Sequence, residues 1–145
     1  MIAHKAAIVV RRPAADVFRF IAVDYFANHP KWAPQVVSVR PTSPGPVAVG
    51  TRGEVVRRLR GREFTYDFEV TDYVANEVIA VEAGGPMPFA AVYAVRPLNK
   101  DESELEVAFM LKMRGWSRLM EPFMADGIRQ EVAAVGCRIK SMLEA

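Results

Sequence analysis

The stretch PFMADGIRQEVAAVGCRIKSMLEA, residues 122–145, closes the chain and decides its fold. Charged side chains such as Arg129, Glu131 and Lys140 suit water, and apolar residues recur at steps of three and four, the α-helical period. They form one stripe, at Met124, Ile128, Val132, Val135, Ile139 and Met142. A helix of this length with one apolar stripe needs a hydrophobic surface to lie on. We expect it to begin near Pro122, after a separate turn over Trp116–Glu121, because proline disfavours helix in the residue before it.

The rest of the chain predicts that surface. β-branched and aromatic residues are dense in segments bounded by proline, glycine or polar turns, which we assign as strands over 5–12, 36–40, 51–60, 62–72, 77–83, 89–96 and 104–113. The fourth segment alternates most clearly, with Phe64, Tyr66, Phe68 and Val70 on one face and polar residues on the other. One buried face and one hydrated face indicate an antiparallel sheet.

Two short helices are expected between the first two strands. Pro13–Asp16 opens the first, with proline and an acid in the first turn, where both are favoured. The second is expected around Tyr25–His29, and Pro30 should stop it. The order is then strand, two short helices, six strands and a long helix, without helices alternating with strands, so the class is α+β. We expect one domain, 1–145, whose curved sheet wraps the long helix and leaves room for a ligand.

The composition excludes several functions. Hydrophobic residues make up 51% of the chain and charged residues 25%, with a net charge of +2, which is ordinary for a globular protein and does not favour DNA binding. The start lacks a signal-peptide pattern and no apolar run is long enough for a membrane span, so we expect a cytoplasmic protein. A single cysteine, Cys137, allows no disulfide within the chain, and we expect it to pack near the sheet.

Catalytic and cofactor motifs are not found in the sequence. His4 and His29 are far apart, without the paired spacing of a zinc site, and no serine sits in a nucleophile-elbow pattern. Gly84–Gly85 precedes a proline rather than a helix, unlike a phosphate-binding loop. We therefore predict no metal and no cofactor.

Arginines crowd the third strand, and their alternation splits them between two faces. Arg52, Arg58 and Arg60 share one face, which is either a solvated outer surface or a site for a polyanion. Arg57 lies on the other face with Val55 and Leu59. If that face points inward, Arg57 enters the cavity and needs an anionic partner; the alternative is that the strand twists and Arg57 reaches solvent at an edge.

The predicted ligand-binding residues share an inward position on a strand or helix. They are Arg57, Phe64, Tyr66, Phe68, Phe89, Tyr93, Phe109, Trp32, Met124, Ile128 and Val132. Tyr66 and Tyr93 are either hydrogen-bond partners of a ligand or plain core residues. His29 is either an acid–base group or a structural residue in its turn.

The chain also carries short motifs in a recognisable order: Pro13–Phe18, Asn28–Pro34, Pro44–Pro46 followed by Val49–Thr51, and Met120–Phe123. With these it resembles the START-like (SRPBCC) superfamily, in particular its polyketide cyclase/dehydrase branch. The resemblance implies a helix-grip fold, with a seven-stranded antiparallel sheet gripping the C-terminal helix around an apolar cavity. Members carry lipids, bind hormones or quinones, or cyclise polyketides.

Three functions follow as hypotheses. The first is binding or carrying of an apolar small molecule such as a lipid, a quinone or an aromatic polyketide. The second is a polyketide cyclase or dehydratase, in which Arg57 stabilises an enolate oxygen and Tyr66 or His29 passes the proton. The third is a protein- or RNA-interaction module that uses the outer arginine face.

Overall fold

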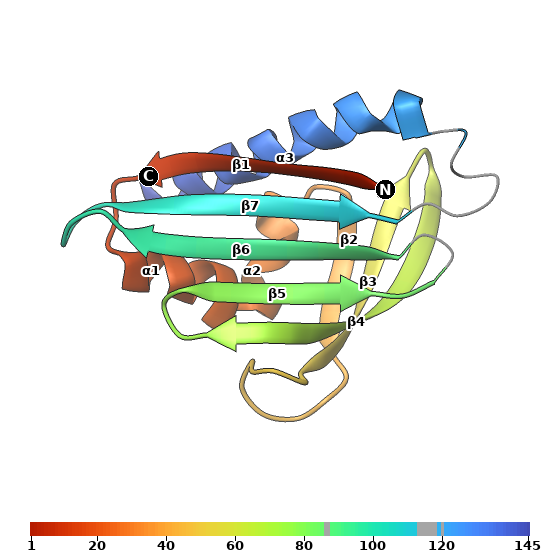
Figure 1. Ribbon diagram of the computed structural model, residues 1–145. Coiled ribbons are helices and arrows are strands. Elements are labelled where there is room, and N and C mark those ends of the chain that lie inside the picture. Colours follow the sequence, from red (N-terminus) through yellow and green to blue (C-terminus); the bar gives the residue numbers. More distant parts are fainter. Residues whose placement is uncertain (86–87, 113–118, 120) are drawn as a thin grey trace.

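A single antiparallel sheet of seven strands forms the body of the protein in the computed structural model, which describes residues 1–85, 88–112, 119 and 121–145. The strands are β1 (Ile2–Val10), β2 (Val36–Pro41), β3 (Arg52–Leu59), β4 (Arg62–Val74), β5 (Val78–Ala83), β6 (Phe89–Pro97) and β7 (Ser103–Leu111). Their order across the sheet is β1-β7-β6-β5-β4-β3-β2, so the first two strands of the chain form its opposite edges (Figure 1). The predicted α+β class and helix-grip fold are confirmed.

The helical connection between β1 and β2 differs in detail from the prediction. It consists of α1 (Ala14–Phe18), a π-helical segment η1 (Arg19–Val23) and α2 (Tyr25–Trp32). Pro30 lies inside α2 rather than ending it, so the expected stop at His29 is wrong. The helix reaches Trp32, whose side chain is fully buried. Burial of this large ring contributes more than the one backbone hydrogen bond that proline cannot donate.

The long helix α3 (Glu121–Leu143) begins close to the predicted residue and packs mainly against β1 and β7 (Figure 1). Most of the turn predicted over 116–121 lies outside the described residues. The stripe faces the sheet, as expected, except at Met142, which is 39% exposed because Ile139 and Leu143 take the inward side of the last turn.

Two predictions about small residues of α3 have opposite outcomes. A methyl group on Gly136 would lie 3.4 Å from Cγ2 of Ile8, so the helix does approach β1 closely there. Cys137 is exposed, and its predicted packing near the sheet is wrong. Its neighbour Gly136 faces the sheet, and successive helical residues point about a quarter-turn apart.

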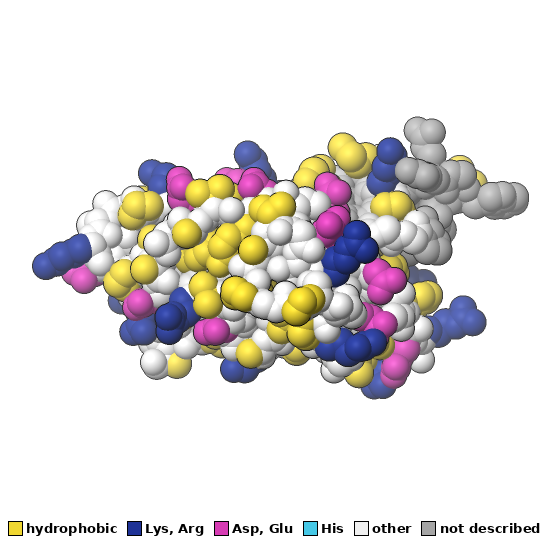
Figure 2. Space-filling model, turned by 90° about the horizontal axis from the view of Figure 1, so that it is seen from below, with side chains coloured by type: hydrophobic (Ala, Val, Ile, Leu, Met, Phe, Trp, Pro, Cys, Tyr) yellow, Lys and Arg dark blue, Asp and Glu magenta, His cyan; other side chains and the backbone are white. Residues whose placement is uncertain are grey.

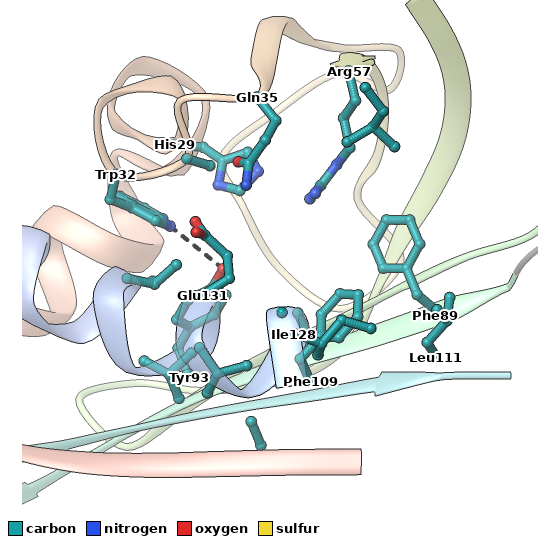
Figure 3. Close-up of a pocket in the computed structure, with 18 of the residues that line it drawn as sticks. His29, Trp32, Gln35, Arg57, Phe89, Tyr93, Phe109, Leu111, Ile128 and Glu131 are labelled. Atoms are coloured by element: carbon teal, nitrogen blue, oxygen red, sulfur yellow. Dashed lines mark hydrogen bonds between the residues drawn. The ribbon is translucent and has the colours of Figure 1, made fainter. Parts of the chain in front are cut away.

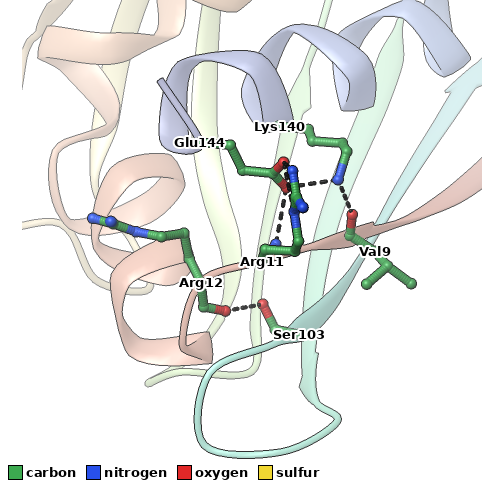
Figure 4. A network of polar contacts seen from close by, with 6 residues as sticks. All are labelled: Val9, Arg11, Arg12, Ser103, Lys140 and Glu144. Atoms are coloured by element: carbon green, nitrogen blue, oxygen red, sulfur yellow. Dashed lines mark hydrogen bonds and ion pairs between the residues drawn. The ribbon is translucent and has the colours of Figure 1, made fainter.

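A polar clamp fixes the C-terminal end of α3 to β1 (Figure 4). The Glu144 carboxylate accepts hydrogen bonds from the backbone N–H of Arg11 at 2.9 Å and from Nζ of Lys140 at 2.6 Å. Lys140 also donates to the carbonyl oxygen of Val9 at 2.7 Å. These donors, the Arg11 N–H foremost, lower the pKa of Glu144 to about 2. The clamp therefore stays charged over the physiological pH range and sets where α3 crosses the sheet.

The hydrophobic core has two parts. The larger lies under α1, η1 and α2 and continues along the sheet to Val132 and Ile139 of α3. A smaller cluster, Ile2 and Leu111, lies near the start of α3. Phe89, Phe109 and Ile128 pack against both clusters. These bulky side chains line the space between the two clusters, and that space is where a ligand can be held.

Among the described residues, no helix has the length and apolar character needed to cross a bilayer.

Candidate functional site

A cavity of about 280 Å³ lies between the concave face of the sheet and α3 (Figure 3). Its wall comes from α2, β3, β4, β6, β7 and α3, so elements distant in sequence meet there. Of the predicted ligand-binding residues, those that line it are Arg57, Tyr66, Phe89, Tyr93, Phe109, Trp32, Met124, Ile128 and Val132. The sheet curvature brings these side chains to one space.

Phe64 and Phe68 are predicted site residues that do not line the cavity. Phe64 is 39% exposed, because it sits near the β3–β4 turn at the end of the hairpin. Phe68 is buried, and its ring centroid lies 5.9 Å from those of both Tyr25 and Phe26. The alternation of β4 correctly placed Phe68 on the inward face, but one part of that face packs in the core and another part lines the cavity.

Aromatic rings form the apolar end of the cavity. The rings of Phe89 and Phe109 are stacked with centroids 5.5 Å apart, and Tyr66 meets Phe89 edge-on at 5.7 Å. Such geometries are favoured by the quadrupoles of the rings and hold each side chain in place. This wall suits an apolar ligand.

Arg57 enters the cavity, as one of the two sequence interpretations required. Its guanidinium carbon lies 5.1 Å from the centroid of the Phe89 ring, a cation–π contact. Its Nε is buried and has no hydrogen-bond partner. Within the described part of the chain no carboxylate pairs with it. Arg57 as a whole is half-buried, and a partly desolvated cation without an anion is unfavourable, so it marks a place for a ligand.

His29 lies beside this arginine at the polar end of the cavity. Its side chain is 3% exposed, stacked on Tyr25 with ring centroids 4.8 Å apart and set edge-on to Trp32 at 5.3 Å. Burial, and then the charge of Arg57, lower its pKa to about 3. The imidazole is therefore neutral at physiological pH, and its Nδ1 has no partner among the described residues.

Tyr93 and Trp32 form a buried polar pair. The indole N–H of Trp32 donates to the hydroxyl oxygen of Tyr93 at 3.4 Å. Burial raises the pKa of Tyr93, so its hydroxyl stays protonated. The hydroxyl therefore accepts from Trp32 and keeps its own hydrogen for another acceptor.

Gln35 and Glu131 also line the cavity, although neither is among the predicted ligand-binding residues. Glu131 lies three residues beyond Ile128 and seven beyond Met124, so helical spacing could have revealed it. Its carboxylate accepts a 2.6 Å hydrogen bond from Arg138, which also donates to the carbonyl oxygen of Trp32 at 3.2 Å. The charge of Glu131 is thus compensated inside the protein.

The cavity consequently has two ends. Figure 3 shows Gln35, His29 and Arg57 reaching in from one side, and Phe89, Phe109 and Leu111 on another. Across the described residues, no cluster of histidine, cysteine, aspartate or glutamate could hold a metal ion. The arrangement can bind an apolar body and present a cation and neutral hydrogen-bonding groups to a polar substituent.

The outer arginines of β3 are paired with acids. Arg52 lies 3.8 Å from Glu69, and Arg58 lies 2.7 Å from Glu63. Figure 2 shows basic and acidic side chains interspersed around a central area of hydrophobic ones on the face it presents. Paired charges attract a polyanion less than a uniform basic patch does, so this surface does not favour the interaction-module hypothesis.

Several solved structures share this helix-grip architecture. The Zhui aromatase/cyclase from Streptomyces sp. R1128 aligns with a TM-score of 0.80 and 12% identity over 98% of this chain and 93% of its own. A START superfamily protein from Mycobacterium smegmatis aligns with a TM-score of 0.71 and 13% identity over 97% of this chain and 98% of its own. At such identities the likeness establishes the fold alone.

A third structure, the di-domain aromatase/cyclase BexL from the BE-7585A biosynthetic pathway, aligns with a TM-score of 0.70 and 17% identity. The alignment covers 96% of this chain and 46% of BexL, so this chain spans about half the length of that protein. No functionally curated protein matches the sequence. The profile of the family described as polyketide cyclase/dehydrase and lipid transport matches residues 1–144, and the chain belongs to that family.

Proposed function

We propose that this protein binds a small, largely apolar molecule in the cavity between the sheet and α3. The observation that carries the proposal is an aromatic cavity with one half-buried arginine, Arg57, that pairs with no carboxylate among the described residues and whose buried Nε has no hydrogen-bond partner there. An apolar pocket with a few converging polar groups is the usual form of a small-molecule site. Membership of a family described by polyketide cyclisation and lipid transport agrees with it.

The volume limits the ligand. A cavity of about 150 Å³ accommodates benzene, and small-molecule pockets typically begin near 300 Å³. At about 280 Å³ this cavity suits a molecule of roughly two fused rings, or one acyl chain, better than a two-chain lipid. A small aromatic polyketide or a quinone ring lies within this range.

The proposal is tested by filling the cavity. Ile128 points into it from α3, and Ile128→Trp would occupy the ligand space, whereas Ile128→Leu preserves volume and serves as the control. Binding of naphthoquinone, naphthalenemethanol and medium-chain fatty alcohols is followed by native mass spectrometry and titration calorimetry. We expect binding to the parent and the Leu variant and at least about tenfold weaker binding to the Trp variant. Equal binding to both variants, or none to the parent, would sink the proposal.

A cyclase or dehydratase activity is the second candidate. It is favoured by one observation: Arg57, Tyr66 and His29 all line the same cavity. Arg57 could stabilise a developing enolate oxygen, but the lowered pKa of His29 makes its imidazole a weak base. Turnover of a polyketide-like β-ketone substrate should therefore fall in both Arg57→Ala and Tyr66→Phe. Activity that survives both changes would rule out these assignments.

A further inference from the structure

We infer that the cavity selects a monocarboxylate: an apolar ring system or acyl chain whose single carboxylate pairs with Arg57. This inference rests on the proposed function and adds the charge and the polar group of the ligand. It follows from the charges that line the cavity, from the neighbours of Arg57 in the sheet, and from the way its guanidinium is held.

One positive charge remains at the cavity when Arg138, which lies behind its wall and pairs with Glu131, is counted with the lining residues. Among the described lining residues, Arg57 and Glu131 are the ionised ones. Glu131 is matched by Arg138, whose guanidinium makes two hydrogen bonds to it, at 2.6 Å and 3.4 Å. His29 contributes a neutral ring. The cation of Arg57 is left over, and a ligand with one negative charge balances it.

The sheet register distinguishes Arg57 from the paired arginines on the outer face. Acidic residues stand directly across the ladder from the outer arginines: Glu54 opposite Arg40, Glu69 opposite Arg52 and Glu63 opposite Arg58. Each of these pairs forms a salt bridge. The residues across from Arg57 are Val36 on one side and Phe64 on the other, and neither can accept its charge.

The guanidinium is also placed for a carboxylate. Phe89 contacts it at 5.1 Å, and Figure 3 shows the Arg57 side chain pointing into the cavity. A guanidinium presents donors in a fixed fork that matches the two oxygens of a carboxylate. The Gln35 side chain enters from the same side and offers a further donor. The aromatic wall of Phe109 and Tyr66 then receives the apolar body.

The test uses ligands that differ only in charge. Naphthoate, naphthalenemethanol and naphthalenemethylamine, substituted at the same ring position, share one ring system; octanoate and octanol form a second pair on a flexible chain. Affinities for the full-length protein are measured by titration calorimetry near pH 7.5. We expect the acid to bind about tenfold or more tightly than the alcohol in each pair, and the amine most weakly. The ring and chain pairs show which apolar body the cavity prefers.

Two variants assign the selectivity to one residue. Arg57→Met should remove the preference for the acid while keeping affinity for the alcohol within about threefold. Arg58→Met, the adjacent outward-facing arginine, should leave the preference unchanged, and circular dichroism verifies that both variants fold. Equal binding of acid and alcohol to the parent protein would overturn the inference and leave the proposed function standing. Binding of neither would overturn both. Even if Arg57→Met does not fold, the comparison of acid and alcohol binding to the parent protein tests the inference.

Discussion

The guanidinium of Arg57 on β3 lies over the ring of Phe89 on β6, at 5.1 Å, although β4 and β5 separate these strands in the sheet. A flat sheet would hold residues three strands apart at roughly 14 Å, the sum of three interstrand spacings. The contact therefore exists because the sheet coils, as twisted antiparallel sheets do. Coiling turns β3 toward β6, so residues that are far apart in the sequence line one cavity.

Replacing Arg57 by methionine should stabilise the protein while weakening its proposed function. The side chain is half-buried and its Nε is buried without a hydrogen-bond partner, and an apolar group of similar length removes the desolvation penalty of that atom. Loss of the cation–π contact offsets part of the gain. We expect a net increase of about 1 kcal/mol in the free energy of unfolding, measured by urea denaturation without ligand. Arg58→Met should change it by less than about 0.5 kcal/mol. A destabilised Arg57→Met would mean that the cation already has a partner.

Arg138 should affect ligand charge selection without lining the cavity. Its 2.6 Å ion pair compensates Glu131, so Arg138→Met leaves a carboxylate facing the ligand. We expect naphthoate affinity to fall about tenfold and naphthalenemethanol affinity to change little. Adding Glu131→Gln to Arg138→Met should restore naphthoate binding. If the double variant binds naphthoate as weakly as the single variant does, Arg138 acts only through its hydrogen bond to the Trp32 carbonyl.

The free energy of unfolding should decrease as the pH is lowered through a range set by the pKa of His29. Burial and the charge of Arg57 lower its pKa from 6.5 to about 3 in the folded protein. Between those values the unfolded chain binds a proton that the folded chain does not, so stability is full above about pH 6.5 and declines as pH falls. Each pH unit costs up to about 1.4 kcal/mol for one such group.

Substitution of His29 by glutamine should make this decline shallower. Thermal unfolding between about pH 4 and 6.5 is compared for the two proteins by slope rather than by absolute Tm, since the substitution also removes the stacking on Tyr25. Arg57 faces the same histidine, and Arg57→Met should reduce the slope in part. Parallel slopes for parent and His29→Gln would contradict the assignment.

Gly53 should tolerate no side chain. A Cβ at this position would overlap Cζ of Phe68 and would lie 2.8 Å from Cε1 of Phe26. Phe68 is buried in the hydrophobic core, and the half-buried Phe26 packs against that core. Overpacking of this kind costs about 1–3 kcal/mol, so Gly53→Ala should lower the midpoint of chemical unfolding. Gly84→Ala is the control, because no atom of the described residues lies within 4 Å of its added methyl group. Equal stability of the two variants would show that the aromatic rings move aside easily.

Alternation and helical periodicity predicted the inward direction of most of the residues that line the cavity. They placed Arg57 and Tyr66 on the inward faces of β3 and β4, and Ile128 and Val132 on the stripe of α3, because both periods follow from local backbone geometry. These patterns failed for residues near the limit of a covered or contacting surface. Phe64 has the correct parity but lies beyond the part of the sheet that the helices cover. Cys137 is one residue away from the position that touches β1.

The sequence by itself determined the order of elements, the face of nearly every strand and the family of the chain, since these depend on residue spacing over a few positions. Tertiary structure alone decided that β3 curls over β6, that Arg57 meets Phe89 there, and that Arg138 compensates Glu131 near α2. These relationships depend on the summed twist of seven strands and on where the long helix crosses them. No local pattern encodes either quantity. The 122–145 stretch specified a helix that needed a surface, and the coiled sheet determined that the surface encloses a charged cavity.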